Sequence, residues 1–396
     1  NYIKNYLRLF IDSVIENPSF DSQTKERLIT PQSKFGSKPE LSDKFIKSII
    51  DKTDIVEKVI QFSEFKLTKE NKKTDGKKRN KIRDIPKLDD ANWAGTAKSE
   101  QCILILTEGD SAKSMAVSGL SVVGRDKYGV FPLKGKVMNV KDASKSQIMN
   151  NSEITNLKKI IGLETGKEYE NTKSLRYGQI MVMTDQDHDG SHIKGLVMNV
   201  FHTLWPSLLK LGFITSMITP IIKVTRGKKV QSFYTLTEYN DWLNKKKSNE
   251  KWNIKYYKGL GTSNASEARE YFSNLKMNNY IFTEDTNESM DLAFSKVQSD
   301  LRKQWLYNYN EQTILNHKET EIPIQEFIHK ELVHFSNSDT LRSIGSVYDG
   351  LKPSQRKILY SCFKRKLFNE IRVAQLAGYV SENAAYHHGE MSLQSA

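Results

Sequence analysis

The sequence predicts an α/β domain with a parallel sheet and flanking helices, followed by a mainly helical region. Two short apolar runs, residues 102–107 and 180–184, have the length and composition of strands that are buried on both faces. Each run is followed by a segment with apolar residues at helical spacing. Strands that alternate with helices favour a parallel sheet. From residue 320 onward, short helical segments rich in Lys, Arg and His follow one another.

The first expected element in chain order is an amphipathic helix over residues 1–16, in which Leu7, Phe10 and Val14 share a face. It should end near Pro18, because the residue before a proline is disfavoured in a helix. Residues 66–83 carry nine basic and two acidic side chains and almost nothing apolar. We interpret them as a loop or linker, either solvated or lying along phosphates.

The central elements follow from the apolar pattern of the sequence. A helix should open after the first strand, and the apolar residues that mark this stretch include Met115 and Leu120. A second helix should follow the second strand, with Ile193, Val200 and Phe201 on one face. Residues 324–335 and 353–363 are then the clearest helical segments of the second region.

Length, charge and cysteine content restrict the class of protein. The 396 residues allow two to three domains, and no stretch of 18 apolar residues predicts a membrane span. The net charge of +13 favours a polyanionic partner, nucleic acid ahead of a membrane surface, although a merely soluble basic protein would have the same balance. Cys102 and Cys362 form no CxxC pair, which fits an intracellular, reducing compartment. Because the chain starts at Asn1 and lacks a helix-ending signal at its other end, we expect a piece of a longer polypeptide.

Two acidic motifs follow the two predicted strands. The first is Thr-Glu-Gly-Asp-Ser-Ala, with Glu108 at the carboxyl end of the strand, and the second is Asp-Gln-Asp-His-Asp-Gly, with Asp185, Asp187 and Asp189. Ligands of open α/β sheets bind beyond the carboxyl ends of the strands, so both motifs should converge on one crevice. Carboxylates this close together repel one another unless a cation lies among them, and their hard oxygen ligands suit Mg²⁺. The alternative is a pair of polar loops whose aspartates cap helices.

The second motif also matches the opening of an EF-hand calcium loop. That interpretation fails on spacing, because the twelfth loop position is Leu196, where a bidentate Glu is required. The segment before the aspartates is also strand-like, whereas an EF-hand loop follows a helix.

Together, the two acidic motifs resemble the TOPRIM domain that topoisomerases and primases share. Other segments are similar to eukaryotic-type DNA topoisomerase II and follow its order along the chain. These segments read IPKLDDAN from Ile85, PLKGK from Pro132, YYKGLGTS from Tyr256, DGLKPSQRK from Asp349 and YHHGE from Tyr386. The resemblance implies a TOPRIM domain followed by the start of a winged-helix DNA-binding region.

The resemblance implies a function and a metal site. The full-length protein would be an ATP-dependent isomerase that passes one DNA duplex through a transient double-strand break in another. Glu108, Asp185 and Asp187 match the family's Mg²⁺ ligands, with Asp189 as an accessory acid, and Glu108 matches a catalytic position. Two metal ions at such a site would help to break and rejoin the phosphodiester. The family's nucleophilic tyrosine would lie beyond Ala396.

The resemblance also implies contacts with DNA and with ATP. Positions that match DNA contacts of the family are Lys136, Asn139, Arg302, Lys303, Lys352, Tyr386 and Ser392. Lys and Arg neutralise phosphates, and Tyr and Ser hydroxyls donate hydrogen bonds to them. Gln23, Thr24 and Lys25 match the loop through which the family's ATPase region reaches its nucleotide. The family further implies double-stranded DNA as a partner, a homodimer, no membrane and a nuclear location.

The expected organisation has five parts. Residues 1–30 would end the ATPase and transducer region, and residues 31–101 would connect it to a TOPRIM domain at 102–218. A TOPRIM-associated α/β extension would cover 219–318, and residues 319–396 would start the winged-helix domain. Gly345 and Ser354 differ from the residues that the family usually carries there, which are proline and often glycine.

Two rival hypotheses remain. A TOPRIM nuclease or primase would lack the LKPSQRK and HHGE segments. A non-catalytic DNA-binding relative would lack the Arg-Tyr pair that the resemblance places farther along the gene.

Overall fold

The computed structural model describes all residues except 1, 2, 5, 6, 9, 11, 37, 39, 79, 80, 83, 246–250, 258, 317, 318 and 387. The chain forms two units, Asn1–Lys73 and Thr74–Ala396. The first unit contains η2 (Gln32–Lys34), α1 (Asp43–Lys52) and α2 (Ile55–Lys73). Ser42 caps α1 by accepting a hydrogen bond from the backbone N–H of Phe45.

Two expectations for the first unit were wrong. The described residues between 7 and 20 contain no helix, and Phe10 and Val14 are each 95% exposed. A helix of that length is marginal unless its apolar face packs against something, and here these side chains are left in solvent. Residues 66–73 are the end of α2 rather than a loop, because Lys, Glu and Asn side chains can all face water on an exposed helix.

The second unit is built on a six-stranded sheet in the order β2-β1-β3-β4-β8-β9. Among the strand pairings of the described residues in this sheet, only that of β4 with β8 is antiparallel. The strands are β1 (Ile103–Glu108), β2 (Tyr128–Leu133), β3 (Gln179–Met183), β4 (Ile214–Met217), β8 (Met277–Ile281) and β9 (Glu321–Pro323). The predicted α/β class with a parallel sheet is therefore confirmed, and β1 and β3 lie within one residue of the predicted runs.

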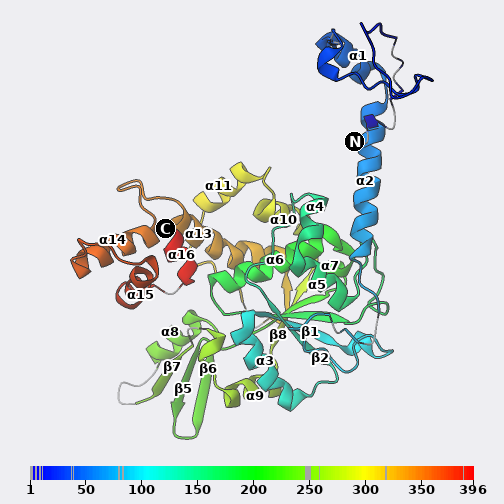
Figure 1. Cartoon of the computed structure of the whole chain (residues 1–396). Coiled ribbons are helices and arrows are strands. Elements are labelled where there is room, and N and C mark those ends of the chain that lie inside the picture. Colours follow the sequence, from blue (N-terminus) through cyan, green and yellow to red (C-terminus); the bar gives the residue numbers. More distant parts are fainter. Residues whose placement is uncertain are drawn as a thin grey trace. The chain divides into compact units, whose positions relative to one another are not determined.

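Alternate residues of the central strands belong to two different cores. Leu104 and Leu106 of β1 pack with one cluster, whereas Ile105 between them packs with the other. The first cluster is covered by helices of the α5–α7 layer and the second by α3 and α9, as Figure 1 shows. These helices are α3 (Gly109–Val123), α4 (Lys145–Asn150), α5 (Ser152–Ile161), α6 (His188–Leu204), α7 (Pro206–Lys210) and α9 (Ala265–Ser273). Burial on both faces explains why the strands read as continuous apolar runs.

A smaller lobe follows β4. Its antiparallel sheet has the order β6-β5-β7, and Phe233 and Tyr239 help to form its own core. The lobe comprises β5 (Ile222–Arg226), β6 (Lys229–Phe233), α8 (Leu236–Lys245) and β7 (Asn253–Tyr256). The 3₁₀ turns η3 (Ser99–Gln101) and η4 (Leu260–Thr262) precede β1 and α9.

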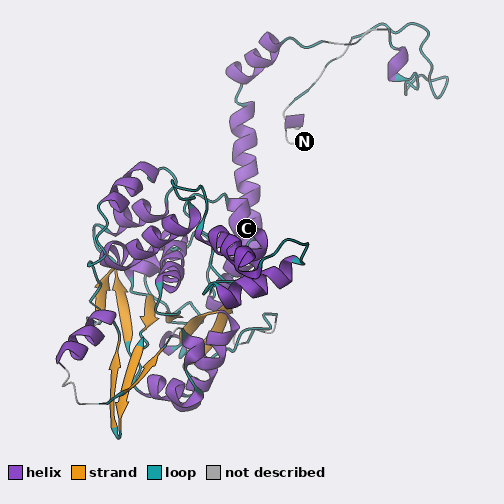
Figure 2. Cartoon of the chain, turned by 90° about the vertical axis from the view of Figure 1, so that its left-hand side faces the viewer, coloured by secondary structure: helices purple, strands orange, loops and turns teal. Residues whose placement is uncertain are grey.

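The described residues after Pro323 form only helices and loops, as Figure 2 shows. Helices α10 (Thr286–Phe294) and α11 (Ser299–Tyr307) lead into β9. A continuous helix then runs through α12 (Ile324–Phe327), the π-helical turn η5 (Ile328–Leu332) and α13 (Val333–Ser343). It is followed by α14 (Pro353–Arg365), α15 (Val373–Asn383) and α16 (Glu390–Ser395). The predicted mainly helical region is thus present.

Candidate metal and nucleic-acid site

The acidic site begins at the ends of two neighbouring parallel strands. Strands β1 and β3 are paired so that Thr107 lies opposite Met183, and Glu108 and Asp185 follow at the same edge of the sheet. Gly109 turns the chain sharply there, with a φ of 77° that favours glycine. The convergence of the two acidic motifs predicted from the sequence is therefore present. We call Glu108, Asp185 and Asp187 the acidic group.

Each aspartate of the acidic group is held by a backbone N–H. Asp185 Oδ1 accepts a hydrogen bond from Leu260 N at 2.7 Å, and Asp187 Oδ1 accepts one from Gly190 N at 2.8 Å. Asp187 is the N-cap of α6, so capping and metal binding, the two interpretations left open by the sequence, are compatible. A Cβ at Gly259 would lie 2.3 Å from Asp185 Oδ2, so only glycine lets this loop approach the acid so closely.

The electrostatics of the acidic group favour a cation. Burial raises the pKa of Glu108 to about 7, and the negative charges of Asp185 and Asp187 add to the shift. Burial likewise raises the pKa of Asp185. Glu108 Oε2 is buried and has no hydrogen-bond partner among the residues that the structure describes. A carboxylate oxygen of this kind could serve as a metal ligand.

The acidic group is not a preassembled metal cage. Within the described part of the chain, no three His, Cys, Asp or Glu side chains are close enough together to hold a metal ion. The donor set nevertheless suits Mg²⁺, which keeps several water ligands and needs only one or two protein carboxylates.

Asp189, the fourth acid, has a different environment. Its Oδ1 accepts a hydrogen bond from Lys136 Nζ at 2.7 Å, and Arg342 grips both oxygens at 2.8 and 3.0 Å. The Arg342 guanidinium, followed by Lys136, lowers the pKa of Asp189 well below its usual range. We call Lys136, Asp189 and Arg342 the Asp189 clamp. The cation that the sequence demanded for this acid is therefore supplied by the protein itself.

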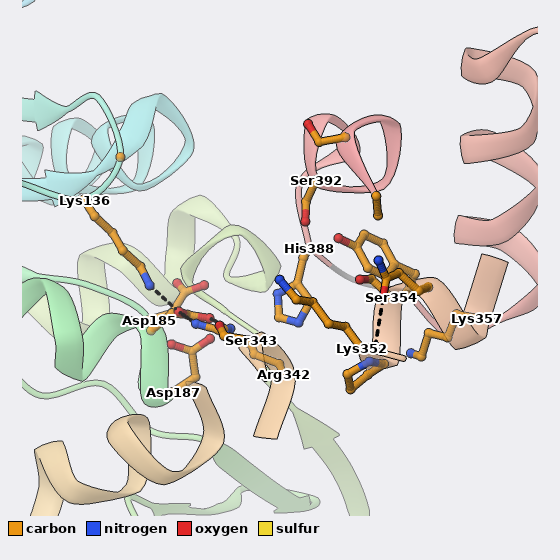
Figure 3. A pocket seen from close by; sticks show the side chains of 18 of the residues that line it. Lys136, Asp185, Asp187, Arg342, Ser343, Lys352, Ser354, Lys357, His388 and Ser392 are labelled. Atoms are coloured by element: carbon orange, nitrogen blue, oxygen red, sulfur yellow. Dashed lines mark hydrogen bonds and ion pairs between the residues drawn. The ribbon is translucent and has the colours of Figure 1, made fainter. Parts of the chain in front are cut away.

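The acidic group and the clamp line one cavity of about 980 Å³. In Figure 3, Lys136 and Arg342 reach the acids from two sides, whereas Lys352, His388 and Ser392 form the wall across the cavity. Tyr386 and Lys357 also line that wall. A wall of cationic and hydroxyl side chains that faces carboxylates is suited to hold a phosphate next to a metal ion.

The cavity contains four of the seven predicted DNA contacts, namely Lys136, Lys352, Tyr386 and Ser392. Lys303 lies outside it as an exposed side chain paired with Asp300 at 2.7 Å. Arg302 also lies outside and donates hydrogen bonds from Nη1 to the carbonyls of Leu292, Ala293 and Ser295, where α10 ends.

Asn139 is the third predicted DNA contact outside the cavity. Its Nδ2 donates to Phe294 O at 2.9 Å, and its Oδ1 accepts from Asn199 Nδ2 at 2.8 Å. The side chain thus ties the loop after β2 to α6 and α10.

Two cationic residues of the cavity, Arg342 and Lys357, were not predicted from the sequence. Lys357 lies in the DGLKPSQRK segment, but the resemblance does not assign a role to its side chain. Arg342 carries no motif signal of its own, because its partner Asp189 lies 153 positions away. The demand of three nearby aspartates for a positive charge was the one usable clue.

The predicted ATP contacts Gln23, Thr24 and Lys25 lie in the first unit. They occupy an exposed turn between Phe20 and Leu28, which form an isolated antiparallel bridge. Lys25 has a φ of 57°, and its N–H donates to Ser22 O at 3.1 Å. The turn is therefore a defined local structure that presents polar side chains to solvent.

Four family models match successive parts of the chain. They are described as DNA gyrase B (residues 1–80), Toprim domain (103–216), C-terminal associated domain of TOPRIM (217–340), and the A-type component of DNA gyrase/topoisomerase IV (342–396). No helix in the described residues is long and apolar enough to cross a membrane.

Relatives match nearly every residue of the chain. DNA topoisomerase 2-alpha of Homo sapiens is 51% identical over 410 residues, which cover 99% of this chain and 27% of that protein. DNA topoisomerase 2 of Arabidopsis thaliana is 53% identical over 401 residues, which cover 100% of this chain and 27% of the relative. The chain thus spans about a quarter of the length of these curated relatives.

A solved structure is also similar. The DNA-binding, cleavage and re-ligation domain of Plasmodium falciparum topoisomerase II superposes with a TM-score of 0.70 at 53% identity, covering 80% of this chain and 44% of that one. The chain therefore belongs to the DNA topoisomerase II family and includes its Toprim domain.

Proposed function

We propose that the protein to which this chain belongs is an ATP-dependent type II DNA topoisomerase, an isomerase that passes one duplex through a transient double-strand break in another. The observation that carries the proposal is the cavity in which the acidic group faces Lys136, Arg342 and Lys352. Similarity to DNA topoisomerase 2 over nearly the whole chain supports the same function.

The acidic group would hold Mg²⁺, in a site for two ions, with Asp189 as an accessory acid and Glu108 as the catalytic position. Bound Mg²⁺ would stabilise negative charge on the scissile phosphate and on the leaving 3′ oxygen. The unpartnered Oε2 of Glu108 and its raised pKa support this assignment, because a cation would relieve the repulsion within the acidic group.

The cationic wall would orient the duplex. Lys136 and Lys352 would neutralise phosphates, and the hydroxyls of Tyr386 and Ser392 would donate hydrogen bonds to them. Lys303 would reach DNA outside the cavity by leaving Asp300, an exposed pair that costs little to break. Arg302 and Asn139 would act on DNA mainly by positioning α10, α11 and the loop that carries Lys136.

Further parts of the mechanism would lie outside the cavity. The attacking tyrosine hydroxyl would come from outside these 396 residues, and Gln23, Thr24 and Lys25 would contact ATP bound by an ATPase fold. We further propose a homodimer that acts on double-stranded DNA in the nucleus. In this division, residues 1–30 end the ATPase and transducer region, 31–101 connect, 102–218 and 219–318 form TOPRIM and its extension, and 319–396 start the winged-helix domain.

Titration calorimetry with Mg²⁺ tests the metal assignment. Asp187→Asn removes a charge from the acidic group but keeps a side chain that caps helices as well as Asp does. We expect the variant to fold normally and to bind Mg²⁺ at least tenfold more weakly, in the range seen when metal-site groups are replaced. Asp84→Asn, which changes the same charge at an exposed pair with Lys159, is the control. Equal Mg²⁺ affinity in wild type and Asp187→Asn would contradict the assignment.

A cleavage assay tests the origin of the nucleophile. The chain is incubated with supercoiled plasmid and Mg²⁺ and quenched with detergent, and linear DNA with attached protein is sought. We expect none, because the carboxylates cannot replace a hydroxyl held in line for attack. A protein-linked break would show that a tyrosine within the chain, such as Tyr379 or Tyr386, is the nucleophile.

A further inference from the structure

The Asp189 clamp has the geometry of an anion-binding site that is already filled. Arg342 meets the carboxylate with two parallel hydrogen bonds, which is how arginine also binds phosphate. Lys136 adds a third hydrogen bond to Oδ1. The side chains of Asp189 and Arg342 are only 25% and 28% exposed, so water weakens the contact less than it would at the open surface.

An aromatic ring holds both cations of the clamp in place. Lys136 Nζ lies 4.6 Å from the centre of the Phe335 ring, and the Arg342 guanidinium lies 5.5 Å from it. The imidazole of His192 stacks on the same ring at 3.8 Å. Cation–π contacts with Phe335 do not depend on Asp189, so the two cations keep a support when the carboxylate leaves.

The helix that carries Arg342 is docked by a separate contact. Glu331 of η5 accepts a hydrogen bond from Ser191 Oγ at 2.7 Å and pairs with the buried Lys194, both on α6. This second attachment lies eleven residues before Arg342 in the same continuous helix. Arg342 can therefore exchange one anion for another by moving its side chain, while α13 stays against α6.

The charge of Asp189 also reaches the acidic group. It contributes to the raised pKa of Glu108, together with Asp185 and Asp187. As long as Lys136 and Arg342 neutralise Asp189, this contribution is reduced, because opposite charges beside it offset its field. Release of Asp189 would make the neighbourhood of Glu108 more negative and hence more attractive to a divalent cation.

We propose that Asp189 is an internal stand-in for a DNA phosphate, so that duplex and divalent cation bind cooperatively. A phosphate displaces the Asp189 carboxylate from Lys136 and Arg342, and the freed carboxylate strengthens cation binding at the acidic group. By linkage, the cation strengthens duplex binding by the same factor, because both ligands favour the opened clamp. The inference rests on the proposed function, since it assumes that phosphates and a cation occupy this cavity.

Duplex affinity with and without Mg²⁺ tests the coupling. Fluorescence anisotropy is measured with a labelled duplex of about 30 base pairs and the 396-residue chain, in EDTA and in Mg²⁺ at constant ionic strength. In EDTA, Asp189→Asn should bind the duplex about five- to tenfold more tightly than wild type, a typical coupling between sites. The gain in affinity caused by Mg²⁺ should be large in wild type and close to one in Asp189→Asn.

Two further variants make the result specific. Asp84→Asn changes the net charge equally without touching the cavity and should behave as wild type. Asp189→Glu keeps the carboxylate and should retain much of the Mg²⁺-dependent gain, which also keeps the test valid if the Asn variant folds poorly.

The outcomes separate the inference from the proposed function. Equal affinities of wild type and Asp189→Asn in EDTA, or an undiminished Mg²⁺ gain in Asp189→Asn, would overturn the inference and leave the proposed function intact. Failure of wild type and all variants to bind duplex would overturn both.

Discussion

Glu108 and Asp189 follow two paired strands of the same sheet and line the same cavity, yet their environments are opposite. Glu108 is surrounded by burial and by other carboxylates, and its pKa rises to about 7. Asp189 lies between two cationic side chains, and its pKa falls well below the usual range. A cluster of acids is therefore no uniform metal site. The partners of each acid decide whether it awaits an external cation or already has one.

The largest expected effect comes from breaking the most deeply buried pairing near this site. Glu331→Ala leaves the Lys194 ammonium, which is 3% exposed, without its charge partner. We expect a loss of about 3–5 kcal/mol in the free energy of unfolding, measured in urea. Glu326→Ala breaks an exposed pair with Lys330 on the same continuous helix and should cost about 0–1 kcal/mol. Similar losses in the two variants would show that burial does not set the value of these pairs.

The unpaired acid predicts a pH dependence of stability in EDTA. The folded state raises the pKa of Glu108 from 4.5 to about 7, so the folded chain binds more protons between these values and stability falls as the pH rises. The cost is absent below pH 4.5 and complete above pH 7. It amounts to about 1–2 kcal/mol after a discount for solvent screening of this half-buried carboxyl.

Glu108→Gln tests this dependence by melting from about pH 5 to about pH 8. The variant should match wild type at the acid end and be more stable at the alkaline end. Added Mg²⁺ should reverse that order at the alkaline end, because only wild type retains all the ligands of the acidic group. A variant that is less stable than wild type at alkaline pH in EDTA would contradict the assigned repulsion.

The smallest expected effect compares a lysine of the cavity with a paired lysine outside it. Lys352 lines the cavity, and the described residues include no ion-pair partner for it, whereas Lys303 pairs with Asp300. Lys352→Ala should flatten the log–log salt dependence of duplex binding by about one unit, and Lys303→Ala by clearly less. Sequence preference should hardly change in either variant, because phosphate contacts carry no base information. Equal slopes would remove the distinction between the two lysines.

The sequence predicted the parts of the fold in which the local pattern and the packing agree. The runs that became β1 and β3 are apolar because both faces of the sheet are covered, and this burial also brings their acidic ends together. The prediction of a helix over residues 1–16 failed because periodicity alone does not provide a packing partner. The Asp189 clamp could not be found from sequence, because Lys136 and Arg342 lie 53 and 153 positions from Asp189.

The double attachment of the helix that runs through η5 and α13 also determines where the molecule can bend. Glu331 and Arg342 fix this helix to α6 near both of its ends, so it moves with the sheet as one body. Residues 344–352, between α13 and α14, include Gly345 and Gly350, and Gly350 has a φ of 70°. Hinges are short connections of this kind, which absorb changes in φ and ψ. Any swing of the Lys352 wall toward or away from the acids must therefore originate in these nine residues, which makes them the natural place to stiffen the enzyme with a single proline.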